Sequence, residues 1–221
     1  MKFFLNRKLF YTAGAVLILA AALCFTGCTS EISLELKKDG SVNVDFNGVA
    51  GDAFASLINA AVGGDPSASS ENLVFNTDEI EYEMSQNGFS NVKAASKNGR
   101  SLSVSMTDKN GKSALFSSGV VTAKNGKLDI VLDRTKLVSF YNQADSQTAM
   151  FLDMLLAPVF NDEKMSEQEY LEVLASFYGQ EIADEIGAAD FRITIKNADG
   201  TQSVHTIKIT KLLTLDEVVR F

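Results

Sequence analysis

Five short turns, each ending in glycine, divide much of the chain into segments in which apolar and polar residues alternate. The turns are Lys38-Asp39-Gly40, Lys97-Asn98-Gly99, Lys109-Asn110-Gly111, Lys124-Asn125-Gly126 and Ala198-Asp199-Gly200. Alternation with a period of two is typical of strands that bury one face. Glycine adopts the left-handed conformation that closes a three-residue hairpin loop. The pattern therefore predicts antiparallel sheet built from hairpins.

The register of each hairpin follows from its apolar positions, because a shift of one residue would move every side chain to the other face. In the first hairpin a three-residue loop pairs Leu36 with Val42, whereas a two-residue turn would place Leu36 opposite Asn43. The other expected pairs are Leu34 with Val44, Ile32 with Phe46, Ala94 with Leu102, Val92 with Val104, Met106 with Ala114, Val104 with Phe116, Thr122 with Leu128, Val120 with Ile130, Phe191 with Ile207, and Ile193 with His205. Residues 89–132 are thus predicted to form a four-stranded meander, bent in its third strand at Ser117-Ser118-Gly119, and residues 190–211 a terminal hairpin.

Helical segments interrupt the strands. Helices are expected at residues 52–62, from a Thr77 cap to Asn87, at 134–142, from Ser166 to Gly179, around Ile182 and Ile186, and after Thr214. Ser166-Glu167-Gln168-Glu169 and Thr214-Leu215-Asp216-Glu217 both have the spacing of a capping box. The expected fold is one α+β domain over residues 32–221, an antiparallel sheet with helices packed on one side and the main helical part at 134–187.

The first 27 residues have the marks of an export signal: a charged start, an apolar centre and a small-residue exit. Lys2, Arg7 and Lys8 precede an uncharged run of 19 residues, Leu9 to Gly27, and Cys28 follows. This arrangement resembles the signal peptide and lipobox of bacterial lipoproteins. The resemblance implies cleavage before Cys28, a lipid on its thiol, and a short tether at residues 28–31. An uncleaved signal anchor stays open as the alternative, because the run is close to the ~20 residues that span a bilayer.

Charge argues against one class of partner. The whole chain has a net charge of -8, with 20 basic and 28 acidic residues. Removal of residues 1–27 takes away three basic residues, which leaves 17 basic and 28 acidic ones and a net charge of about -11. Such a surface repels DNA, RNA and anionic lipid headgroups, so no nucleic-acid partner is expected.

Cysteine usage supports the anchor. The chain has two cysteines, Cys24 and Cys28. If the first leaves with the signal and the second is lipidated, the mature domain has no free thiol. Disulfides, thiolate catalysis and cysteine metal sites are then excluded.

The remaining residues give little indication of catalysis. His205 is the single histidine and is expected mid-strand, as a structural or solvent-facing side chain. Gly111-Lys112-Ser113 imitates the end of a phosphate loop, but Met106 stands where that motif needs glycine. The acidic cluster Asp78, Glu79, Glu81 and Glu83 suits the first turns of a helix. No cofactor, metal site or catalytic residue is predicted.

Residues 149–160 form an apolar run broken by one charge, Asp153. We expect a helix buried under the sheet, and keep open an exposed wall for a membrane or an apolar ligand. The side chains of that possible contact surface are Met150, Phe151, Met154 and Leu155.

The leading expectation is a non-enzymatic interaction or assembly module, held in the bacterial cell envelope by a lipid on Cys28. It would lie in the outer membrane where the host has one, and otherwise in the plasma membrane, with an envelope protein or lipid as partner. The part of the chain after the signal has a general likeness to small envelope lipoproteins of spirochaete-type bacteria. This likeness assigns no functional residue. An apolar-ligand carrier is the alternative, and a hydrolase using paired carboxylates is the third candidate.

Overall fold

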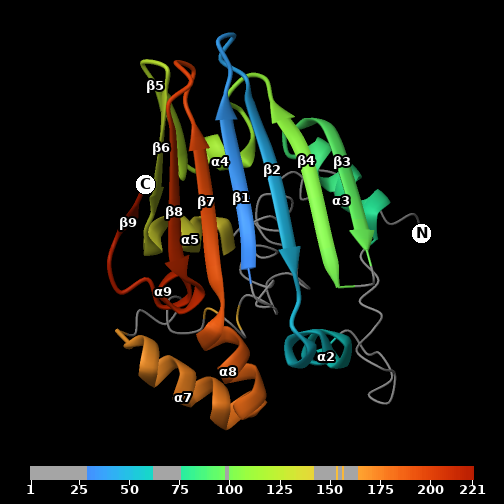
Figure 1. Cartoon of the computed structure of the whole chain (residues 1–221), viewed down its shortest axis with the longest axis vertical. Helices are drawn as coiled ribbons and strands as arrows, with labels where there is room; N and C mark the ends of the chain where they lie inside the picture. The colour runs from blue at the N-terminus through green and yellow to red at the C-terminus, as the bar shows by residue number, and fades with distance from the viewer. Residues whose placement is uncertain (1–28, 62–75, 98–99, 142–152, 154–155, 157–163) are drawn as a thin grey trace, which may run out of the picture.

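The computed structural model describes residues 29–61, 76–97, 100–141, 153, 156 and 164–221. These residues form two sheets, a six-stranded one in the order β3-β4-β2-β1-β7-β8 and a three-stranded one in the order β5-β6-β9 (Figure 1). The strands are β1 (Thr29–Leu36), β2 (Val42–Val49), β3 (Ser90–Lys97), β4 (Ser101–Asp108), β5 (Val121–Lys124), β6 (Lys127–Leu132), β7 (Asp190–Lys196), β8 (Gln202–Lys208) and β9 (Val219–Arg220). The helices are α2 (Asp52–Ala61), α3 (Thr77–Gln86), α4 (Ala114–Ser117), α5 (Arg134–Tyr141), α7 (Glu167–Tyr178), α8 (Gln180–Ala188) and α9 (Ile209–Thr214).

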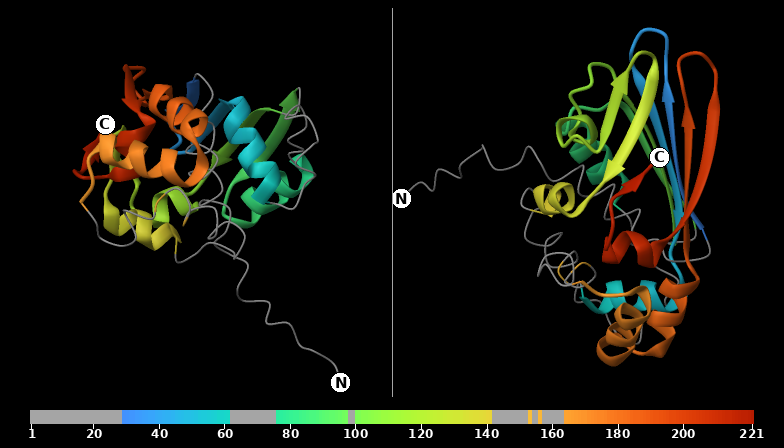
Figure 2. Two further views of the ribbon diagram at one scale, coloured as in Figure 1. Left: turned by 90° about the horizontal axis from the view of Figure 1, so that it is seen from below. Right: turned by 90° about the vertical axis from the view of Figure 1, so that its left-hand side faces the viewer.

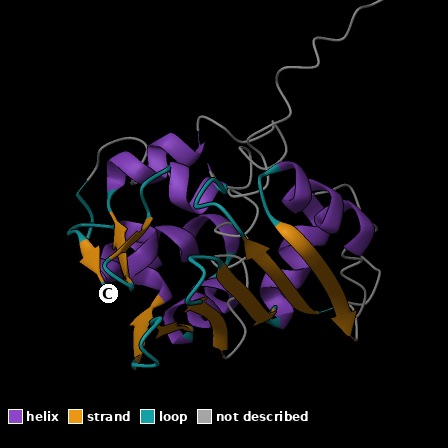
Figure 3. Cartoon of the chain, turned by 90° about the horizontal axis from the view of Figure 1, so that it is seen from above, coloured by secondary structure: helices purple, strands orange, loops and turns teal. Residues whose placement is uncertain are grey.

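The larger sheet has one covered face and one open face. The three-stranded sheet, α4 and α5 lie behind it, while α2, α7 and α8 close one end (Figures 1 and 2). Figure 3 looks along the strands from the end opposite α2, α7 and α8. Neighbouring strands are antiparallel except β1 and β7, which run parallel. The predicted α+β class is therefore confirmed.

The first and last hairpins have the predicted registers. Leu36 pairs with Val42 in β1–β2, and Phe191 pairs with Ile207 in β7–β8. Gly40 and Gly200 close the two loops, each with a φ of 85°. In both hairpins the apolar parity and the left-handed glycine require the same loop length, so the prediction is well determined.

The two hairpins between them have different registers. Ala94 pairs with Val104 rather than Leu102, because the loop lies one residue later and includes Arg100. The expected pair of Val92 with Val104 is wrong for the same reason. Val121 pairs with Ile130 across a two-residue Asn125-Gly126 turn, with φ of 54° and 75°, so the expected pairs of Thr122 with Leu128 and Val120 with Ile130 are wrong. Asn-Gly favours this tighter turn because both residues tolerate positive φ.

The four-stranded meander over residues 89–132 is wrong. β3 and β4 belong to the larger sheet, and β5 and β6 to the smaller one. No hairpin forms at Lys109-Asn110-Gly111, because the Asp108 carboxylate binds the following amides and α4 begins at Ala114. Met106 and Val104 pair instead with β2, so their expected partners Ala114 and Phe116 are corrected. Ser117-Ser118-Gly119 ends α4 and bends no strand.

Five of the predicted helices are present, one of them with a different cap, and the helix predicted after Thr214 is wrong. The capping box at Ser166 is confirmed, with Ser166 Oγ accepting from the Glu169 amide. The cap of α3 is Asn76 rather than Thr77. Thr214-Leu215-Asp216-Glu217 starts no helix. Thr214 is the last residue of α9, and the backbone of Leu215 has a left-handed conformation. The chain then pairs with β6 as strand β9.

A single hydrophobic core joins the elements on the covered face. It takes residues from the larger sheet, the smaller sheet and most helices, including Leu34, Val44, Phe46, Phe54, Met84, Ile130, Tyr170, Leu174, Ile186, Ile193 and Leu213. Ile80 and Met84 of α3 are buried as predicted. The core faces away from the open side of the larger sheet, which leaves that side free to carry polar side chains.

Candidate interaction surface

The open face of the larger sheet carries mostly polar side chains, with Val49 of β2 and Val204 of β8 as exposed apolar exceptions. Alternation along each strand buries one set of side chains and turns the other set outward. The outward set comprises Glu31, Ser33 and Glu35 of β1, Asn43, Asp45 and Asn47 of β2, Ser101, Ser103, Ser105 and Thr107 of β4, and Arg192, Thr194 and Lys196 of β7. None of the described helices lies over this face (Figure 2).

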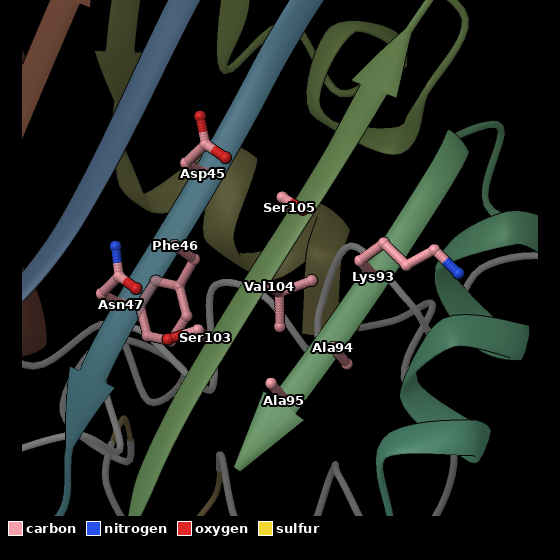
Figure 4. A pocket seen from close by; sticks show the side chains of 9 residues that line it. All are labelled: Asp45, Phe46, Asn47, Lys93, Ala94, Ala95, Ser103, Val104 and Ser105. Atoms are coloured by element: carbon pink, nitrogen blue, oxygen red, sulfur yellow. The ribbon is translucent and has the colours of Figure 1, made fainter. Parts of the chain in front are cut away.

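A shallow groove lies on this face over β2, β4 and β3 (Figure 4). Its outward side chains are Asp45, Asn47, Lys93, Ala95, Ser103 and Ser105, with Phe46, Ala94 and Val104 in its floor. Two cross-strand rows define it: Lys93, Ser105 and Asp45 form one, and Ala95, Ser103 and Asn47 the other. Ser105 lies between the longer Lys93 and Asp45, and Ser103 and Ala95 are both short beside Asn47, so the small side chains leave the depression.

The groove offers donors and acceptors for hydrogen bonding. Asp45 and Lys93 lie on strands separated by β4, so their backbones are two strand spacings apart, about 10 Å. A carboxylate, an amide, two hydroxyls and an ammonium group together suit a polar ligand or an exposed polar segment of another protein.

Ion pairs join the parallel strands β1 and β7 beside the groove. Lys196 Nζ lies 2.7 Å from Glu35 Oε1, and Arg192 Nε lies 4.0 Å from Glu31 Oε1. Hydrogen bonds from Lys196 and Lys37 lower the pKa of Glu35. These contacts fix the charged side chains along the open face at neutral pH.

The edge strand β3 is covered by α3. The Glu81 carboxylate accepts a hydrogen bond from the Ala94 amide at 2.9 Å. The acidic cluster at residues 78–83 therefore has a structural role at this position, because an exposed strand edge would otherwise present free amides for intermolecular pairing. No group of three or more potential metal ligands occurs in the described part of the chain.

His205 is half-exposed in β8, as expected for a structural or solvent-facing side chain. Its Nε2 lies 3.1 Å from Ser203 Oγ, and its ring packs on Phe221 with centroids 5.1 Å apart. The ring thus joins the larger sheet to the smaller one, since Phe221 is hydrogen-bonded to Ile130.

Most of the other predicted site residues lie outside the described residues. They are Cys28, Met150, Phe151, Met154 and Leu155. Within the apolar run at 149–160, Asp153 is exposed and Leu156 is 1% exposed. The described ranges contain no helix long and apolar enough to span a bilayer.

The sequence predictions missed the groove. A signal was present, since β4 alternates serine or threonine at 101, 103, 105 and 107 with apolar residues between them. Small polar residues at alternate positions of one strand indicate a face that no other element covers. The side chains that flank them on the neighbouring strands depend on strand order, which was not predicted.

Comparison with known proteins finds no match to this chain. No family model matches the chain, no curated protein matches it, and no solved structure matches it.

Proposed function

We propose that the chain is a bacterial envelope lipoprotein, anchored through a lipid on Cys28, whose folded domain is a non-enzymatic interaction module. The observation that carries the anchor is the start of the fold. β1 begins at Thr29 and Ser30 is fully buried, so residues 29–31, which were expected to be a tether, belong to the folded domain. A cut before Cys28 would therefore remove the export signal and leave the central strand β1 whole.

Replacing Cys28 tests the anchor. In a bacterial host fed a labelled fatty acid, we expect the wild type to incorporate label and to enter the detergent phase on phase separation. Cys28→Ala should incorporate none and stay in the aqueous phase, because the acceptor thiol is gone. Cys24→Ala is the matched control and should behave as the wild type. Label on Cys28→Ala would contradict the proposal.

The open sheet face supports the interaction role. It is broad, uncovered by described helices, and carries fixed charges beside a groove of mixed donors and acceptors. The partner in this proposal is a polar surface of an envelope protein.

A photo-reactive residue placed in the groove tests this role. We expect incorporation at Ser103 to give a discrete cross-linked product in intact cells. The same residue at Ser85, an exposed serine of α3, is the control and should give none. Equal products at both positions, or none at Ser103, would contradict a specific interaction at this face.

A further inference from the structure

The two ends of the domain differ. β1 has eight residues and therefore spans about 25 Å. It starts at the end closed by α2, α7 and α8 and finishes at the hairpin turns (Figure 1). Thr29 pairs with Asp190, which is two residues beyond the end of α8. Cys28 directly precedes Thr29 in the sequence. A lipid on Cys28 would therefore hold the helical end, rather than the turns, toward the bilayer.

The helix α7 at this end exposes two large apolar side chains. Phe177 is 76% exposed and Val173 is 38% exposed. They are four residues apart and so lie on one face, while Tyr170 and Leu174 fill the core from the other. The Phe177 ring is tilted against Tyr178, with centroids 6.3 Å apart. An exposed phenylalanine next to an exposed valine has no role in the core of the domain.

We propose that the α7 face formed by Val173 and Phe177 contacts the lipid bilayer that holds the anchor. This inference rests on the proposed lipidation of Cys28. The absence of a spacer between Cys28 and β1 brings the helical end within reach of the headgroups. At that level an aromatic ring and a branched aliphatic side chain bury apolar surface in the interface.

Charge determines which lipids fit. α7 contains Glu167, Glu169 and Glu172, and α8 contains Glu181, Asp184 and Glu185, with no lysine or arginine in either helix. Anionic headgroups would be repelled by these carboxylates. The contact is therefore made through apolar side chains, in a bilayer whose headgroups are zwitterionic.

The chain contains no tryptophan, so a single introduced indole reports its own surroundings. The test uses the lipidated protein, carrying either Phe177→Trp or Tyr82→Trp, in phosphatidylcholine vesicles with brominated acyl chains. Tyr82 is 61% exposed on α3, beside β3 and away from α7, and is the matched aromatic control (Figure 1). We expect the Phe177→Trp emission to shift to shorter wavelength and to fall roughly twofold, since interfacial side chains lie ~5–10 Å into the headgroup boundary. The Tyr82→Trp emission should not change.

The outcomes separate the inference from its premise. Vesicle-bound protein with an unquenched Phe177→Trp indole, or with equal quenching of both variants, would overturn the α7 contact while lipidation stands. Protein that carries no lipid and stays free of vesicles would overturn the proposed anchor, and the α7 contact with it. Adding Val173→Ser to Phe177→Trp should weaken the quenching, because it removes the neighbouring apolar side chain.

Discussion

Asp108→Ala is expected to lower the free energy of unfolding by about 3 kcal/mol, because a buried carboxylate that accepts several amides is lost and those amides are left without partners. Oδ1 accepts from the amides of Asn110 and Gly111 at 2.8 and 2.7 Å, and Oδ2 from the amide of Ser113 at 2.9 Å. Asp108 is 1% exposed, so water cannot replace it without rearrangement. Urea denaturation of wild type and variant measures the difference.

The pH dependence of the free energy of unfolding gives a second measurement of the same hydrogen bonds. Burial raises the pKa of Asp108, but hydrogen bonds from Ser113, Asn110 and Gly111 outweigh burial and hold the pKa below its usual value. A depressed folded-state pKa contributes stability above the unfolded pKa of about 3.9, and that stability is lost as the pH falls through the folded pKa. The gap in stability between wild type and Asp108→Ala should therefore narrow below about pH 4.

Asp199→Ala is the control for both measurements. Asp199 also accepts from a backbone amide two residues on, that of Thr201 at 2.9 Å, but it is exposed on the β7–β8 turn. Its loss should have a much smaller effect, because water can solvate the freed amide. Equal effects of the two substitutions would show that the Asp108 bonds do not hold the β4–α4 connection.

Asp108 also marks the point where the sequence pattern misleads. Lys109-Asn110-Gly111 looks like the other turns, and the apolar residues after it keep the parity of a strand. A carboxylate at the start of such a loop can bind its amides and favour a helical turn over a hairpin. The Asp108 carboxylate therefore favours the helical turn over the hairpin that the apolar parity predicts.

The end hairpins were predictable because two independent signals agreed. In β1–β2 and β7–β8 the parity of the apolar face and the place of the left-handed glycine require the same loop. In β5–β6 they conflict: Asn125-Gly126 takes the tight turn, and Val121 replaces Val120 opposite Ile130. The geometry of the turn sets the register there, and that register decides which side chains of β5 lie opposite those of β6.

The candidate groove lay beyond sequence reasoning for a different reason. Its two rows of side chains cross β3, β4 and β2. These strands are neighbours only because of the strand order of the sheet, in which β2 pairs with β4. Strand order comes from long-range packing, which the alternation of one strand does not contain. The parallel pairing of β1 with β7 joins segments that are more than 150 residues apart, and it was missed on the same ground.

Gly51→Ala is expected to lower the free energy of unfolding by about 1 kcal/mol, because it displaces a single side chain that caps a helix. A Cβ at position 51 would lie 2.3 Å from Glu185 Oε2. That carboxylate caps α2 from α8, accepting from the amides of Ala53 at 2.8 Å and Phe54 at 3.0 Å. The added methyl group would displace it and release both amides.

A double-mutant cycle tests whether the two positions act through one contact. Glu185→Ala alone should cost about 1 kcal/mol, as the loss of a helix cap does. In that background Gly51→Ala should cost less than about 0.5 kcal/mol, because the clashing carboxylate is absent. Glu181→Gln, an exposed glutamate of the same helix, is the control and should change little. Additive effects of Gly51→Ala and Glu185→Ala would contradict the coupling and assign the cost of the methyl group to the backbone at residue 51.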